Sequence, residues 1–184
     1  MNHETPRIAV IFATSQGSTR EIAEYVGADL ANRRADVEVA DVAHAPELSR
    51  FDAVILGSAV HDREVLPEMS EFVRAHANEL TAAEVWIFSV GIGPALRGPI
   101  GRWLGRKVPQ NIASLRDSVS PKGYRAFAGH YERAGVSLRA RALYRLFGGP
   151  RYGDLRDWSA ISDWSATIAR ALRLPQPKSI IVYP

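Results

Sequence analysis

The sequence predicts a doubly wound α/β fold, in which an open parallel sheet of five strands is covered by helices on both faces. Three observations support this prediction: apolar runs recur along the chain, helical patterns separate them, and most connections are short. Several runs are apolar almost throughout, which is typical of parallel strands buried on both faces. We expect right-handed crossovers and a single domain over residues 1–184. The predicted strands are residues 8–12, 37–40, 53–56, 85–90 and 124–128.

The first predicted helix spans residues 18–34, directly after the first strand. Ile22, Val26 and Leu30 recur every four residues, which places them on one apolar face toward the sheet. Ser18 and Glu21 have the S-x-x-E spacing of a capping box, in which both side chains bind backbone N–H groups of the first turn.

Two further helices are predicted, one from an apolar stripe and both from their end signals. Pro67 opens a helix over residues 68–79, and its buried stripe is Met69, Phe72, Val73 and Leu80. The last helix is predicted over residues 162–172, capped by Ser162 and stopped by Pro175.

Composition excludes several kinds of site. The chain has no cysteine, so it holds no disulfide, iron–sulfur cluster or thiolate zinc site, and redox chemistry needs a bound cofactor. No metal site is predicted. Glu4 and Pro6 stand where a signal peptide would be apolar, and no apolar run approaches the roughly 18 residues of a spanning helix. We therefore expect a cytoplasmic protein that does not cross the membrane.

A polar loop between the first strand and the first helix has the chemistry of an anion site. Four hydroxyls and the backbone N–H groups are expected to converge at the amino terminus of the helix, whose dipole favours negative charge, and a glycine lets the backbone approach a phosphate closely. The alternative is a polar turn that only caps the helix. The pattern is neither a P-loop, because the lysine is absent, nor a G-x-G-x-x-G fingerprint. The loop residues are Thr14, Ser15, Gln16, Gly17, Ser18 and Thr19.

This loop resembles the T-x-T-G-x-T phosphate loop of flavodoxins, with Thr14, Gly17 and Thr19 matching and Gln16 in place of the middle threonine. The resemblance implies a flavodoxin-like three-layer sandwich, strand order 2-1-3-4-5, and FMN as the cofactor. Two more loops fall where flavodoxins contact the flavin, at the carboxyl ends of the third and fourth strands. They are Ser58, Ala59, Val60 and His61, and Val90, Gly91, Ile92 and Gly93.

The chain is most similar to one branch of this superfamily, the menaquinone-dependent protoporphyrinogen IX dehydrogenases. The similarity extends over nearly the whole chain, and it implies an FMN-dependent oxidoreductase of haem biosynthesis that oxidises a porphyrinogen and passes electrons to a membrane quinone. The similar segments are residues 12–14, 19–23, 71–73, 127–129 and 162–164, and the basic helix before Gly148.

Positive charge is concentrated in one part of the chain. Residues 97–151 contain twelve lysines and arginines against two acidic residues, so the net charge there is about +10 although the whole chain carries +3. Such a segment favours an anionic partner, or it is a solvated basic face without one. Its first part, about residues 97–122, is predicted to be an elaborated basic insertion.

The insertion contains arginines, whose guanidinium groups bind carboxylates through two parallel hydrogen bonds, and a tryptophan, whose ring offers a flat apolar face. Both suit a substrate that carries carboxylates on an apolar ring system. The candidate substrate residues are Arg97, Arg102, Trp103 and Arg106, with Lys107 beside them; the alternative is scattered surface charge. Residues 137–147 form a predicted basic amphipathic helix, which suits either the anionic inner face of a membrane or packing against the core. No nucleic-acid-binding motif is present.

Two histidines, His61 and His130, lie near predicted strand ends on the ligand side, as proton carriers or as structural residues. No residue is assigned as catalytic. The sequence leaves three other functions open: a flavodoxin-type electron carrier, a deazaflavin-binding redox protein, and a flavin-free domain on the same scaffold.

Overall fold

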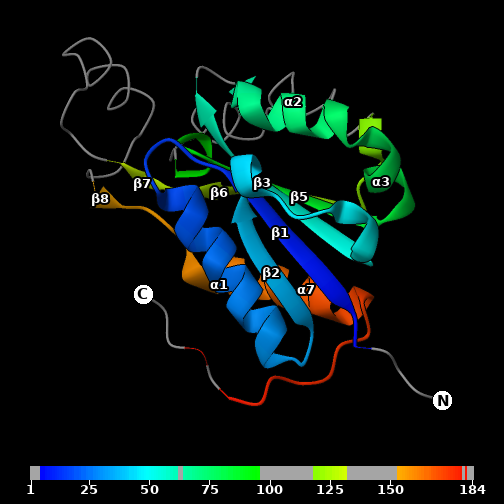
Figure 1. Ribbon diagram of the computed structural model, residues 1–184. Helices are drawn as coiled ribbons and strands as arrows, with labels where there is room; N and C mark the ends of the chain where they lie inside the picture. Colours follow the sequence, from blue (N-terminus) through cyan, green and yellow to red (C-terminus); the bar gives the residue numbers. More distant parts are fainter. Residues whose placement is uncertain (1–4, 62–63, 96–117, 132–152, 180, 182–184) are drawn as a thin grey trace, which may run out of the picture.

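The computed structural model describes residues 5–61, 64–95, 118–131, 153–179 and 181. Its central sheet has the order β2-β1-β3-β5-β6, and all four neighbouring pairs are parallel (Figure 1). A short antiparallel strand, β4 (Glu64–Val65), pairs with the end of β3. Without it the order is the predicted 2-1-3-4-5, which is confirmed. The parallel strands are β1 (Arg7–Ala13), β2 (Asp36–Asp41), β3 (Ala53–His61), β5 (Glu84–Gly91) and β6 (Gly123–Ala128).

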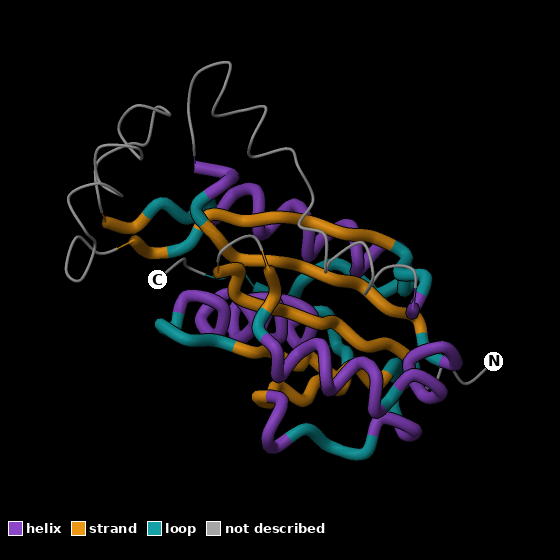
Figure 2. Tube along the Cα trace, turned by 90° about the horizontal axis from the view of Figure 1, so that it is seen from above, coloured by secondary structure: helices purple, strands orange, loops and turns teal. Residues whose placement is uncertain are grey.

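Helices cover both faces of the sheet, as predicted for a three-layer sandwich (Figures 1 and 2). On one face lie α1 (Ser18–Asn32) and α7 (Trp158–Ala171), and on the other lie α2 (Pro67–Ala75) and α3 (Ala77–Ala82). A two-stranded ribbon, β7 (His130–Tyr131) and β8 (Gly153–Asp154), follows β6. Three 3₁₀ turns are η1 (Val42–His44), η2 (Leu48–Arg50) and η3 (Gly93–Ala95).

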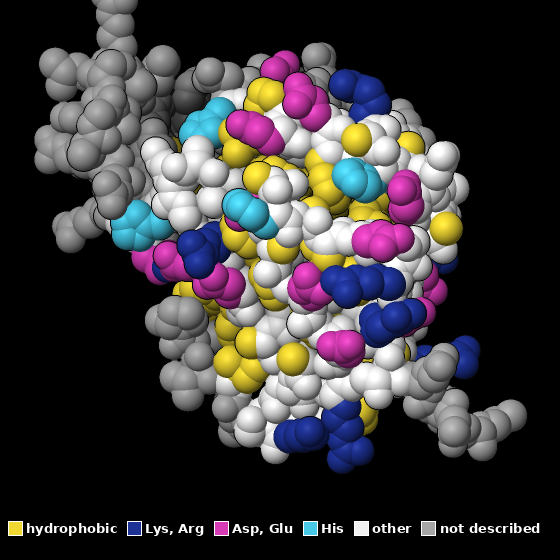
Figure 3. All heavy atoms as spheres, viewed as in Figure 1, with side chains coloured by type: hydrophobic (Ala, Val, Ile, Leu, Met, Phe, Trp, Pro, Cys, Tyr) yellow, Lys and Arg dark blue, Asp and Glu magenta, His cyan; other side chains and the backbone are white. Residues whose placement is uncertain are grey.

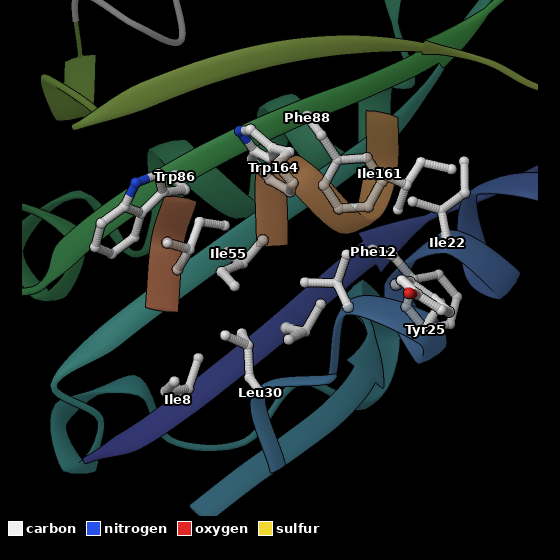
Figure 4. Close-up of a cluster of buried hydrophobic side chains, with 14 of the residues drawn as sticks. Ile8, Phe12, Ile22, Tyr25, Leu30, Ile55, Trp86, Phe88, Ile161 and Trp164 are labelled. Carbon is white, nitrogen blue, oxygen red and sulfur yellow. The ribbon is translucent and has the colours of Figure 1, made fainter. Parts of the chain in front are cut away.

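The alternation of β1 divides the core into two parts. Ile8, Val10 and Phe12 point to the layer of α1 and α7, whereas Ala9 and Ile11 point to the layer of α2 and α3. Every one of these five side chains is at most 6% exposed, because the central strand has a helix layer on each side. Figure 4 shows the first of these layers, where side chains from α1, α7 and the strands meet.

Aromatic rings join α7 to the last two strands of the sheet. The ring of Trp164 lies 5.7 Å from that of Phe88 and 5.6 Å from that of Phe127, both in edge-on arrangements. A Cβ at Gly57 would lie 2.1 Å from the Phe88 ring, so the glycine of β3 makes room for this packing.

A buried carboxylate joins the two helices of the same layer. Asp29 of α1 accepts hydrogen bonds from Ser165 of α7 at 2.7 Å and from Arg33 at 3.1 Å. Asp29 is 5% exposed, and these two donors replace hydrogen bonds to water that its carboxylate loses on burial.

The predicted capping box of the first helix is wrong. The helix begins at Ser18 as expected, but its N-cap is Gly17, with φ +92° and no side-chain cap. The side chains of Ser18 and Glu21 bind groups from the distant segment 130–156 instead. The S-x-x-E spacing fits the local capping pattern, but in the structure His130 and Arg156, which are far along the chain, bind the side chains of Ser18 and Glu21.

Two other helix predictions need correction. The predicted helix 68–79 is two helices, because His76 leaves the helical conformation (φ −111°, ψ 24°) between α2 and α3. The last helix begins at Trp158, four residues before the predicted start. Its N-cap is Asp157, whose carboxylate accepts the N–H of Ala160 at 3.0 Å, so the predicted cap Ser162 lies inside the helix.

Most of the predicted basic insertion and the whole predicted basic helix, residues 137–147, lie outside the described residues. The same is true of the substrate candidates Arg97, Arg102, Trp103 and Arg106, and of Lys107. Within the described ranges, no helix combines the length and the apolar character that a membrane crossing requires.

Candidate functional site

The three loops singled out in the sequence meet at one edge of the sheet. Ala13, the last residue of β1, pairs with Ser58 of β3, and Ala59 pairs with Val90 of β5. The loops that follow these strands therefore start side by side at the carboxyl edge, where ligands of doubly wound sheets bind.

The first turn of α1 carries backbone donors without an intrahelical acceptor at this edge. The first N–H of the helix with an intrahelical acceptor is that of Glu21, which bonds to the Gly17 carbonyl at 3.1 Å. The N–H groups of Ser18, Thr19 and Arg20 precede it, and they are the donors that every α-helix leaves without an intrahelical partner. They point along the axis at the positive end of the helix dipole.

Gly17 shapes the approach to these donors. Its N–H donates to Thr14 Oγ1 at 3.0 Å, which closes the loop into a tight turn. The left-handed φ of +92° suits glycine, and a Cβ built there would meet no heavy atom within 4 Å. The space in front of the turn is open, so a ligand can reach the backbone closely.

Three of the four loop hydroxyls already have protein partners. Thr14 holds Gly17, Ser15 Oγ lies 2.6 Å from His61 Nε2, and Ser18 Oγ accepts the N–H of His130 at 2.9 Å. The fourth, Thr19, is 1% exposed. The hydroxyls of Thr14, Ser15 and Ser18 thus hold the loop in shape instead of converging on one point, and the backbone N–H groups of the first turn are the remaining candidates for binding an anion.

The end of β3 folds back into a hairpin with β4. Ser58 is 2% exposed, and its Oγ accepts the N–H of Leu66 at 3.1 Å and donates to the Ala59 carbonyl at 2.9 Å. Val60 is half-buried and pairs with Val65, which leaves His61 exposed at the tip beside Ser15. The hydrogen bond between Ser15 and His61 therefore connects the first and second predicted cofactor loops.

The end of β5 lies directly against this hairpin. Val90 is 4% exposed, and a Cβ at Gly91 would lie 3.3 Å from Cβ of Val60, so the glycine permits the close approach. Ile92 and Gly93 follow as half-buried residues that lead into η3. The third predicted loop thus lies next to the second.

Sequence reasoning missed Gly129 as part of this edge. A Cβ there would lie 3.0 Å from Cγ1 of Val90 and 3.4 Å from Oγ of Ser18, so only a small residue fits between β5 and the first turn of α1. Its neighbour His130 donates its N–H to Ser18. A glycine directly after a predicted strand at the ligand edge was the signal that could have found it.

Sequence reasoning also missed an arginine that reaches the first turns of α1. Arg156 binds Asp154 through two hydrogen bonds of 2.8 and 2.7 Å and forms an ion pair with Glu21. The hydrogen bonds from Arg156 hold the pKa of Asp154 below its ordinary value. Arg156 also lies over the ring of Trp158, 4.7 Å from its centroid.

A groove of about 570 Å³ lies on the β2 side of the loop, lined by residues that include Thr14, Arg20, Asp41 and Leu66. Asp41 accepts hydrogen bonds from the ring and backbone of His44, and the bond from the ring lowers the pKa of Asp41. Over α1, acidic and basic side chains lie interspersed (Figure 3).

An open parallel sheet of this strand order, with helices on both faces, defines a protein of the doubly wound α/β class. The chain belongs to the flavodoxin family, since residues 9–143 match the model of the flavodoxin domain. Membership of this family implies flavin binding.

Among curated proteins, the chain is similar to a protein of Escherichia coli strain K12 named protoporphyrinogen IX dehydrogenase [quinone]. The two are 25% identical over 187 residues, which is 92% of this chain and 98% of the other.

Solved structures with the same fold include two flavodoxins. One is from the domain Archaea, with a TM-score of 0.58 and 16% identity over 91% of this chain and 99% of the other. The other is flavodoxin 2 of Bacillus cereus, with a TM-score of 0.56 and 16% identity over 90% and 99%. These structures establish the fold of this chain.

The residues at the carboxyl edge fit a flavin that carries a phosphate. The open left-handed turn at Gly17 and the free donors of the first turn of α1 suit a phosphate group. The loops after β3 and β5 provide apolar side chains, Val60 and Ile92, beside the exposed His61.

Proposed function

We propose that this chain is an FMN-dependent oxidoreductase. The observation that carries the proposal is the start of α1 at Gly17, where a left-handed turn beside open space leads into the positive end of the helix dipole, in a chain of the flavodoxin family. In this proposal, residues 14–19 hold the phosphate, and residues 58–61 and 90–93 contact the ring system. Bound FMN would supply the redox chemistry by exchanging a hydride with the substrate.

The protein contributes binding and orientation. The N–H groups of Ser18, Thr19 and Arg20 donate to the phosphate, and the dipole of α1 adds favourable electrostatic energy. His61 is held by Ser15 at 2.6 Å, and this bond fixes the hairpin tip relative to the phosphate loop. Gly91 lies close to Val60, which brings the loops after β3 and β5 together where the ring system is proposed to lie.

For the substrate, we propose a porphyrinogen, with a quinone as electron acceptor. The support is the similarity to the dehydrogenase of Escherichia coli, whose name gives this substrate and acceptor and which aligns over nearly both chains. The residues proposed to bind the propionates are Arg97, Arg102 and Arg106, and Trp103 is proposed to offer a flat apolar face to the porphyrinogen.

The same proposal covers location and organisation. A quinone acceptor suits a cytoplasmic protein of one domain, residues 1–184, that touches the anionic inner face of the membrane through its basic segment. Vesicle sedimentation with and without anionic lipid tests this part independently of the chemistry.

The experiment that tests the function is steady-state turnover. Protein loaded with FMN is mixed anaerobically with protoporphyrinogen and a soluble menaquinone analogue, and formation of the fluorescent porphyrin is followed. We expect turnover that requires both the protein and the quinone. A flavodoxin-type electron carrier would show none. Mass spectrometry of the ligand released by denaturation distinguishes FMN from a deazaflavin.

A further inference from the structure

Glu21 places a negative charge at the end of the first turn of α1, the turn that is proposed to bind a phosphate. It is half-exposed and lies three residues after Ser18, about one helical turn from the proposed phosphate. A carboxylate at this distance repels a phosphate dianion, because the two are within one Debye length.

Arg156 lies against this carboxylate. Its side chain is 7% exposed, and its guanidinium contacts Glu21 on one side and Asp154 on the other. The ring of Trp158 lies beneath it, and Trp158 in turn packs on Tyr25 of α1 at 5.3 Å between centroids. The guanidinium is therefore held in place from three sides and has little freedom to move.

Among the described residues, Glu21, Asp154 and Arg156 sum to one negative charge, and His130 pairs with Asp154 across the ribbon of β7 and β8. Beside Glu21 on the helix, Arg20 forms an ion pair with Glu24 at 2.8 Å. Arg156 is thus a cation that offsets the carboxylate of Glu21.

We propose that Arg156 is a positioning residue that neutralises Glu21 and thereby sets the preference of the site for FMN over riboflavin. This inference rests on the proposed function. FMN and riboflavin share the ring and ribityl chain and differ in the phosphate, so the ratio of their dissociation constants isolates the electrostatic effect at the first turn of α1.

Four proteins test the proposal: wild type, Glu21→Gln, Arg156→Gln and the double variant. Equilibrium titrations of the apoproteins give dissociation constants for both flavins. We expect Glu21→Gln to raise the preference for FMN about three- to tenfold, and Arg156→Gln to lower it by a similar factor. The double variant restores the net charge of wild type, so its preference should return to within about twofold.

Three controls separate charge from structure. Arg156→Lys keeps the cation and should retain most of the preference. Glu38→Gln removes a carboxylate of similar exposure from an ion pair with Arg50, distant along the sheet, and should change nothing. The effects of Glu21→Gln and Arg156→Gln should shrink at 1 M salt, because the Debye length falls to about 3 Å.

The Glu21→Gln variant decides the matter even if the arginine variants fold poorly. If the contact serves only to hold the two segments together, Glu21→Gln weakens the binding of FMN or leaves the preference unchanged, and the inference is overturned. If wild type binds the two flavins equally, the proposed phosphate site itself fails, which is a different outcome.

Discussion

Gly17, in the loop after β1, and Gly57, in β3, are glycine for different physical reasons. Gly17 is required by backbone conformation, because its φ is +92° and the space around it is open. Gly57 is required by packing, because a Cβ would lie 2.1 Å from the ring of Phe88. The sequence marks both as glycine after an apolar strand, and only the structure separates the two reasons.

Gly57→Ala should therefore destabilise the protein by about 2–3 kcal/mol, since the added methyl must displace a ring that is 0% exposed. Urea denaturation followed by circular dichroism measures this loss. Gly91→Ala is the matched control: its nearest atom would be at 3.3 Å, so a smaller loss is expected. Equal losses in the two variants would contradict the packing argument.

At the scale of the element, α7 illustrates what local sequence patterns predict and what they miss. A helix here is predicted from its end signals, and the structure has one, with Ile161, Trp164 and Ile168 buried. Its start was placed at Ser162, although Asp157 caps it. Aspartate and serine both cap helices, so the sequence alone does not decide between Asp157 and Ser162 as the N-cap. The start of the helix depends on where the chain turns after β8, which the local pattern does not contain.

Asp157→Ala should lower the free energy of unfolding by about 1 kcal/mol, because the N–H of Ala160 loses its acceptor. Ser162 lies inside the helix, so Ser162→Ala should change the free energy of unfolding by less than about 0.5 kcal/mol. Thermal unfolding of the two variants measures both effects. A larger loss for Ser162→Ala would support the cap position expected from sequence.

The whole molecule shows which features the sequence could predict. The five strands follow from apolar periodicity, their order from the resemblance to flavodoxins, and the meeting of three loops at one edge from the switch-point rule; the structure confirms the fold. The contact between Glu21 and Arg156 joins residues 135 positions apart. Local patterns carry no information on such a pair, so the capping box was expected where a long-range ion pair exists.

Two aspartates should make the stability of the whole molecule fall in acid. Hydrogen bonds from Arg156 and from His44 lower the pKa values of Asp154 and Asp41 below those of the unfolded chain. Each therefore stabilises the folded state above its unfolded pKa, and this contribution is lost as the pH falls from about 5 to about 3.

Denaturation at a series of pH values measures the slope. Asp154→Asn should have a shallower decline than wild type in this range, and Arg156→Gln should flatten the curve in a similar way, because it removes the group that lowers the pKa. An unchanged slope in both variants would show that the pair does not contribute to acid sensitivity.

The central claim is that the first turn of α1 holds the phosphate of a flavin, and direct titration tests it. Purified apoprotein is titrated with FMN, and quenching of flavin fluorescence is followed. We expect saturable binding of one FMN per chain with a dissociation constant of about 1 μM or below. No association at about 100 μM FMN, with correctly folded apoprotein, would contradict the account.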